Sequence, residues 1–174
     1  MSFTDREFRN ALGQFGTGVA IVTADVEGTL LGTTVSSFNS VSLSPPFVLF
    51  SLARSAFAHP LWMKAKTFAV MILREDQSEL STRFARGGTD KWMGLNPERG
   101  IAGVPLLGGG LATFICKTHA IHDGGDHDIV VGHVLSFVLS EGAPLLFHGG
   151  RYRRLQSEQA IETPPDADTW LHGW

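Results

Sequence analysis

The spacing of apolar and polar residues predicts a helix at the beginning of the chain. Thr4 and Glu7 have the spacing of a capping box, and Phe3 lies where a hydrophobic staple begins. Apolar side chains then recur on one helical face at Phe8, Leu12 and Phe15. Gly16 and Gly18 are expected to end this helix, because glycine is a poor helix former.

The rest of the chain is patterned as strands separated by turns. Apolar and β-branched runs predict strands at 19–23, 30–43, 47–52, 67–73, 112–122, 129–139 and 145–152. Helices are expected at 57–66 and 78–86, and a glycine- and proline-rich connection at 87–110. So many strands with so few helices favour a mainly β fold, an antiparallel barrel or sandwich with peripheral helices. A doubly wound parallel sheet would need a helix after nearly every strand.

Composition supports one folded domain and excludes several classes of protein. The 174 residues are 43% hydrophobic, and the formal net charge of −3 provides no cationic surface for nucleic acid. Cys116 is the single cysteine, which excludes an internal disulfide and a thiolate zinc site. The polar N-terminus is not a signal peptide, and no apolar run has the length of a membrane span, so we expect a soluble cytoplasmic protein. The domain is expected at 1–153, followed by a polar C-terminal tail at 154–174.

The segment 33–44 is unusually rich in hydroxyl side chains, which seven of its twelve residues carry. If it is extended throughout, residues 34, 36, 40, 42 and 44 share one face, and Val35, Val41 and Leu43 share the other. A row of hydroxyls can donate to an anion such as a phosphate without adding a fixed charge. The alternative interpretation is an edge strand kept soluble by small polar residues.

Arg54 and the histidines are the other candidates for chemistry. Arg54 follows a buried strand, where it would either add a cation to a binding site or remain a surface residue. Four histidines cluster between residues 119 and 133: His119, His122, His127 and His133. Residues 119 and 122 point to opposite faces of one strand and no carboxylates with ligand spacing accompany them, so we expect no metal site. His127 lies in the glycine-rich turn 124–128, from which it would either project into a cleft or remain a surface residue.

Several motifs recur in a specific order and spacing along most of the chain. They are FRNAL at 8–12, FGTGVAIVT at 15–23, GTTVSS at 32–37, SVSLSPP at 40–46, GDHD at 125–128, VG at 131–132, PLLFH at 144–148 and GRY at 150–152. Together, over about residues 8–153, they resemble the short-chain flavin reductases, the reductase components of two-component flavin monooxygenases. The resemblance implies an antiparallel split β-barrel, the FMN-binding split barrel, with peripheral helices. It also implies a homodimer with the flavin near the subunit interface.

The resemblance further implies an NAD(P)H:flavin oxidoreductase that transfers a hydride from NADH or NADPH to FMN or FAD and supplies reduced flavin to a partner monooxygenase. It assigns to cofactor binding Thr33, Thr34, Val35, Ser36, Ser37, Leu52, Ala53, Arg54, Ser55, Phe84, His127, Arg151 and Tyr152. His127 would lie beside the nicotinamide as the one catalytic residue, with Arg151 and Tyr152 helping to close that pocket. Val35 departs from the family, whose members often have alanine there.

Two alternatives stay open. The first is a split-barrel flavin carrier or oxidase-like relative without free-flavin reductase activity, although the Gly-Asp-His turn favours a reductase because a carrier needs no nicotinamide site. The second is a barrel that binds a small molecule without catalysis. FMN and FAD are not distinguished. The chain shows no arginine cluster for a 2′-phosphate, which favours NADH over NADPH.

Overall fold

The computed structural model describes residues 3–88 and 90–156, which form a mainly β fold. The strands are β1 (Thr17–Gly18), β2 (Ala20–Val26), β3 (Thr29–Val35), β4 (Asn39–Leu43), β5 (Pro46–Ala53), β6 (Thr67–Ile72), β7 (Glu98–Arg99), β8 (Pro105–Leu106), β9 (Ala112–Asp123), β10 (His127–Leu139), β11 (Leu146–His148) and β12 (Arg151–Arg153). The α-helices are α1 (Asp5–Leu12), α2 (His59–Trp62) and α3 (Ser78–Ala85). Short 3₁₀ turns occupy Glu75–Gln77, Asp90–Trp92 and Ile101–Gly103.

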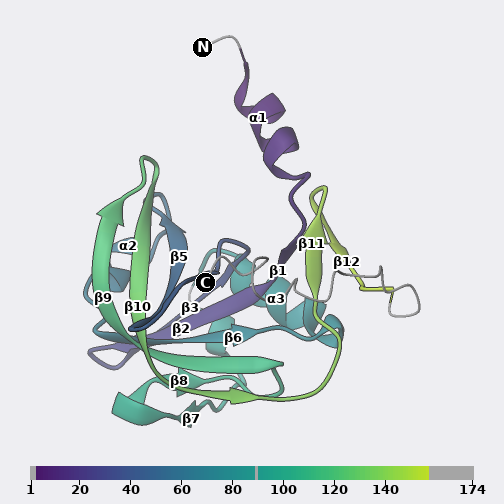
Figure 1. Cartoon of the computed structure of the whole chain (residues 1–174). Helices are drawn as coiled ribbons and strands as arrows, with labels where there is room; N and C mark the ends of the chain where they lie inside the picture. Colours follow the sequence, from purple (N-terminus) through teal and green to yellow (C-terminus); the bar gives the residue numbers. More distant parts are fainter. Residues whose placement is uncertain (1–2, 89, 157–174) are drawn as a thin grey trace.

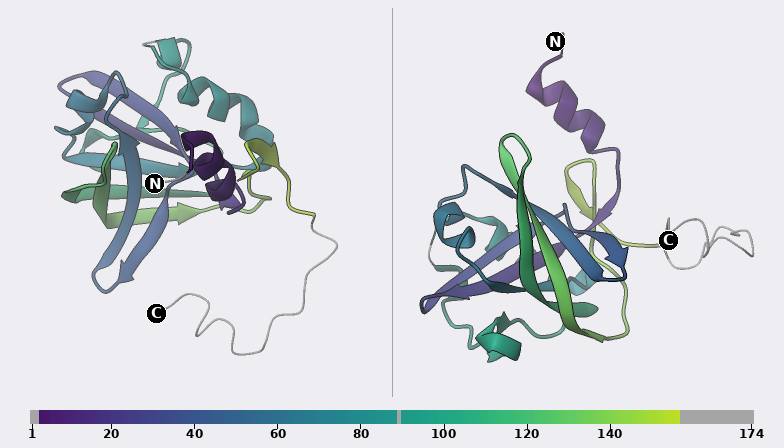
Figure 2. Two further views of the ribbon diagram at one scale, coloured as in Figure 1. Left: turned by 90° about the horizontal axis from the view of Figure 1, so that it is seen from above. Right: turned by 60° about the vertical axis from the view of Figure 1, so that its left-hand side comes forward.

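One antiparallel sheet of seven strands, in the order β3-β2-β6-β9-β10-β5-β4, forms the body of the molecule. The long β9–β10 hairpin runs through its centre, and Figure 1 shows it rising beside β5 at one end of the barrel. Register shifts at Val131/Gly132 and Val134/Ser136 interrupt the hairpin, and such bulges bend a strand. The sheet therefore curls around its core, as the turned views in Figure 2 show, and the expected split-barrel architecture is confirmed.

The main core fills the inside of this curved sheet. Its buried side chains include Val22, Phe50, Trp62, Phe68 and Cys116. Gly132 is required at the bend of β10, because a Cβ there would stand 2.4 Å from Cζ of Phe68. A second cluster lies under α3 and joins the helix to β2 through Ile21, Leu73 and Phe84. β1 pairs with β11, which in turn pairs with β12, and these strands make a small separate sheet beside α3 (Figure 1).

The helix at the start of the chain begins as predicted but ends earlier. The Thr4–Glu7 capping box is present, and the rings of Phe3 and Phe8 are 5.5 Å apart. α1 ends at Leu12, because the N–H of Gly13 closes the last turn on the carbonyl of Arg9. The glycines at 16 and 18 therefore do not end it. None of the eight residues of α1 is buried, and the helix stands away from the sheets in Figure 1.

Three of the predicted elements are wrong in extent. The expected strand 30–43 is two strands, β3 and β4. β4 has a register shift between Ser40 and Ser42, and its Val41 and Leu43 are exposed. The expected helix 57–66 shortens to the single turn of α2. The expected strand 145–152 is the hairpin β11–β12, turned at Gly149 and Gly150, whose φ angles are positive. The strand predicted at 19–23 corresponds to β2, which continues three residues further, to Val26. The remaining predicted strands and the helix at 78–86 are confirmed to within two residues at either end.

Within the described ranges, no helix is long and apolar enough to cross a membrane. Most of the expected C-terminal tail, from residue 157 onward, lies outside the described residues.

Candidate functional site

The hydroxyl-rich segment connects β3 and β4, the two edge strands of the seven-stranded sheet. Thr33 and Thr34 lie on β3, where Thr34 Oγ1 donates to the carbonyl of Ser81 in α3 at 2.6 Å. Val35 is buried, and Ser36 is exposed where the strand ends. Ser37 Oγ accepts from the Ser51 N–H at 2.9 Å and donates to the Ser51 carbonyl at 3.2 Å. This pair of bonds holds the segment after β3 against β5. The hydroxyls of Thr34 and Ser37 thus position backbone, whereas Ser36 lies at the surface.

The end of β5 and the start of β10 lie side by side and carry the second group of expected residues. Leu52 pairs with Asp128 and Ala53 with His127 in the antiparallel register. The Arg54 N–H donates to the Asp126 carbonyl at 3.0 Å, which extends the pairing beyond the strand. Arg54 and Ser55, which follow β5, therefore lie beside the Gly-Asp-His turn.

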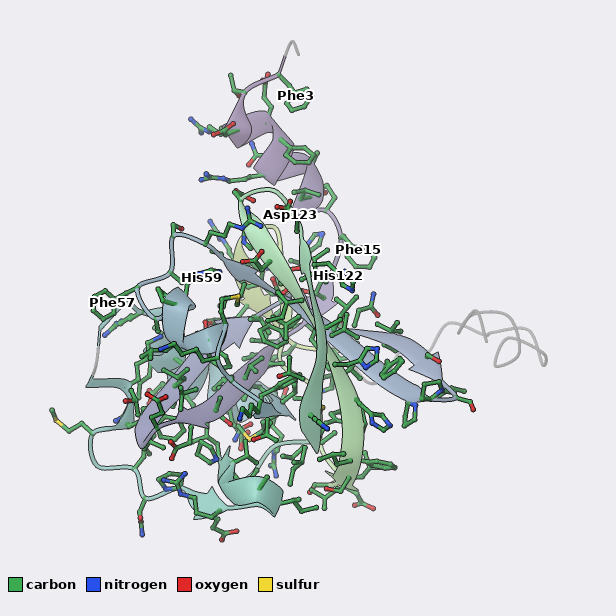
Figure 3. All side chains as sticks on the ribbon, turned by 90° about the vertical axis from the view of Figure 1, so that its left-hand side faces the viewer. Phe3, Phe15, Phe57, His59, His122 and Asp123 are labelled. Atoms are coloured by element: carbon green, nitrogen blue, oxygen red, sulfur yellow. The ribbon has the colours of Figure 1, made fainter. Side chains whose placement is uncertain are left out.

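Arg54 is held by two carboxylates. Its Nη2 donates to Asp128 Oδ1 at 2.6 Å and to Asp123 Oδ2 at 2.7 Å, and its Nε donates to Asp128 Oδ1 at 3.1 Å. The other oxygen of Asp128 lies 2.6 Å from His59 Nε2, at the first residue of α2. Figure 3 shows His59 and Asp123 toward this end of the molecule. The Arg54–Asp128 hydrogen bond raises the pKa of Arg54, and the bonds from Arg54 and His59 lower the pKa of Asp128.

His127 is the half-exposed histidine of the β9–β10 turn. Its Nδ1 lies 2.7 Å from Asp126 Oδ1, and this hydrogen bond lowers the pKa of Asp126. Asp126 therefore engages one of the two ring nitrogens of His127. Two of the remaining histidines have a different role: the rings of His119 and His133 pack on Phe47, with centroids 4.4 and 5.5 Å away.

A cleft of about 950 Å³ lies along α3. Its lining includes Gln77, Thr82, Arg83, Lys91 and Tyr152. The Tyr152 hydroxyl is 2.8 Å from Ser81 Oγ, which ties β12 to α3 at the rim. Lys91 Nζ donates to the carbonyls of Gly32 and Phe84 at 3.0 and 2.9 Å, and burial lowers its pKa. Arg151 lies exposed on β12, paired in register with His148.

Phe84 does not reach the cleft. It is fully buried, and its ring packs against Gly32 and edge-on against Trp92, 5.0 Å between centroids. The residue expected next to the flavin therefore supports α3 from below in this structure, because its side chain points from the helix into the core rather than away from it.

Several of the expected residues are linked by a series of contacts. Tyr152 meets Ser81, Ser81 meets Thr34, and Ser37 meets Ser51 on β5, whose end lies beside His127. Sequence reasoning missed Asp123 and Asp128, which hold Arg54, and His59, which bonds Asp128. It also missed Ser81, which joins the rim to β3. Asp128 belongs to the quoted GDHD motif, but its partners come from β5 and α2, and only the strand register identifies them.

Comparison with known proteins identifies the fold and chemistry. Residues 12–156 match the family described as "Flavin reductase like domain". The chain belongs to the flavin reductase family. One relative, the FMN reductase (NADH) of Agrobacterium fabrum, is 47% identical over 153 residues, covering 88% of this chain and 87% of the relative. The reductase subunit HsaB of a flavin-dependent monooxygenase from Rhodococcus jostii is 34% identical, covering 95% and 91%.

A solved structure extends the likeness to bound ligands. The NADH:FAD oxidoreductase SgcE6 of Streptomyces globisporus, in complex with NAD and FAD fragments, superposes with a TM-score of 0.84 at 35% identity, covering 90% of this chain and 96% of that one. The expected flavin reductase family is therefore confirmed, and so is its pairing of flavin with nicotinamide. The residues assigned to cofactor binding by the resemblance include those near the ends of β3 and β5 and at the start of β10.

Proposed function

We propose that this protein oxidises NADH and transfers the hydride to free FMN or FAD, releasing reduced flavin to a partner monooxygenase. The observation that carries the proposal is the 47% identity to a relative named FMN reductase (NADH). The site's composition supports it. A phosphate could bind the exposed residues Ser36 and Ser55 and the half-exposed guanidinium of Arg54. His127 is paired with Ala53, next to Arg54, in the β5–β10 register.

In this proposal the chain's own residues bind and orient. The segment 33–37 and Leu52–Ser55 would hold the flavin, which when bound supplies the hydride-accepting ring. His127 would orient the nicotinamide through the ring nitrogen that Asp126 leaves available, and Arg151 and Tyr152 would close the pocket from β12. The transfer of a hydride from the nicotinamide carbon needs no general acid or base at that carbon. The protein must therefore orient the nicotinamide against the flavin rather than supply acid–base chemistry. Phe84 would act from the core by keeping α3 in place.

We also propose a homodimer. Its support is a large exposed apolar surface, because patches of this kind mark interaction sites. Four large apolar residues on α1 and on either side of it are each between 51% and 76% exposed: Phe3, Phe8, Leu12 and Phe15. A second exposed set lies on β4 and the end of β10: Leu43, Leu135, Phe137, Val138 and Leu139. A second copy of the chain could cover both.

We further propose that residues 1–153 act as the domain, with the tail at 154–174 outside it, and that the protein works in the cytoplasm, where NADH is available.

The deciding experiment follows the loss of NADH absorbance with purified protein and FMN, FAD or no added flavin. Oxidation that rises with added flavin supports the reductase, and the preferred flavin follows from the same data. Bound yellow flavin without NADH oxidation would instead indicate a flavin carrier or oxidase-like protein. A protein that neither binds flavin nor oxidises NADH would overturn the proposal.

A further inference from the structure

The cation expected to bind the flavin phosphate is already engaged by two anions. Arg54 Nη2 donates to Asp123 Oδ2 and to Asp128 Oδ1, and its Nε donates to the same Asp128 oxygen. One positive charge thus faces two negative charges, each within 2.7 Å of the guanidinium. The Arg54 side chain remains 41% exposed, so a ligand can still reach it.

Such an arrangement weakens the attraction of Arg54 for a phosphate. At these distances the carboxylates offset the field of the guanidinium, and they repel an anion that approaches it. They also occupy the Nε side of the planar fork, which would otherwise bind two phosphate oxygens. A flavin that is used as a substrate must leave the site after each turnover, and weaker attraction for its phosphate favours this release.

We propose that Asp123 and Asp128 limit the flavin affinity of the site by neutralising Arg54, so that flavin exchanges as a substrate. The inference rests on the proposed function, in which Arg54 faces the flavin phosphate. Asp123 and Asp128 are positioning residues, because they act through Arg54 and need not touch the flavin. Asp128 is 11% exposed and also bonds His59, so it fixes the direction of the guanidinium. Asp123 is 76% exposed and contributes mainly its charge.

Asp123→Asn tests the proposal without disturbing the fold. Asp123 Oδ1 accepts the Gly125 N–H at 3.0 Å in the hairpin turn, and an amide oxygen accepts in the same way. Glu98→Gln is the matched control, since it removes one exposed carboxylate from β7, in a separate two-stranded sheet. Arg54→Met, alone and combined with Asp123→Asn, shows whether the effect passes through Arg54.

The measurement is the Kd for FMN from flavin fluorescence titration, with KM for FMN and for NADH from steady-state rates. We expect Asp123→Asn to bind FMN about two- to fivefold more tightly, as fits an exposed ion pair, and to lose the gain at high salt. KM for FMN should fall in parallel while KM for NADH stays unchanged. A purely structural role would not tighten binding.

Three results would overturn the inference. The first is an unchanged or weaker Kd in Asp123→Asn, and the second is an equal gain in Glu98→Gln. The third is a gain of the same size in the Arg54→Met background, because Asp123 would then act without Arg54. If the unaltered protein neither binds flavin nor oxidises NADH, the proposed function fails first and this inference fails with it.

Discussion

Gly32 lies directly against the ring of Phe84, so closely that a Cβ on Gly32 would stand 2.4 Å from Phe84 Cε1. This contact lets α3 approach β3, and Thr34 and Lys91 bond across the same junction. The rim of the α3 cleft and the hydroxyl-rich strand are therefore joined at one glycine. Its φ is not in the left-handed region, so the requirement for glycine here is one of space alone.

Replacing Gly32 with alanine should therefore destabilise the protein. Phe84 is fully buried and its ring cannot move away without shifting α3, so we expect a loss of about 1–3 kcal/mol in the free energy of unfolding. Urea denaturation measures it. Gly18→Ala is the control, since no heavy atom lies within 4 Å of a Cβ there. Equal stability of the two variants would contradict the close packing of α3 on β3.

The Asp128 carboxylate should make stability depend on pH in the acid range. Its hydrogen bonds with Arg54 and His59 lower its pKa in the folded protein. The stabilisation is therefore complete above the unfolded-state pKa of ~3.9 and is lost as the pH falls from there through the lower folded-state pKa. Urea denaturation between about pH 6 and pH 2 should show a shallower acid loss of stability in Asp128→Asn than in the unaltered protein. The same acid slope in both would contradict the assignment.

The sequence predicted the architecture better than the contacts of the site. Apolar periodicity located most strands, and the motif order identified the family, because both are properties of local sequence. The break after Val35 was not predictable, since the hydroxyl residues 36–44 suit an extended strand as well as a bend. The ion pairs of Arg54 depend on the register of β5 against β10, which brings Asp128 beside Leu52. The family resemblance assigned Phe84 to the flavin site, and its complete burial under α3 depends on tertiary packing that the local sequence does not show.

His127 should matter more for the nicotinamide than for the flavin. Its ring is held by Asp126 and stands at the start of β10, beside the end of β5. We expect His127→Ala to lower kcat/KM for NADH about tenfold, equivalent to about 1.4 kcal/mol, while the Kd for FMN changes little. His122→Ala is the control, because this exposed histidine lies on the same hairpin and pairs with Ile129. An equal loss in turnover and flavin binding would show that His127 has another role.

The exposed face of α1 leads to a separate test of assembly. Leu12 is 58% exposed, and no residue of α1 is buried, so a charge at this position should leave the free energy of unfolding of a single chain nearly unchanged. If a second copy covers this face, burying a carboxylate there without a partner is costly, and Leu12→Glu should shift the protein from dimer to monomer. Asn10→Glu is the control, because it adds the same charge in the same helix turn at an exposed polar position. Sedimentation velocity across a range of concentrations distinguishes the outcomes. A Leu12→Glu protein that stays as dimeric as Asn10→Glu would place the interface elsewhere, with the exposed ends of β4 and β10 as the remaining surface to test.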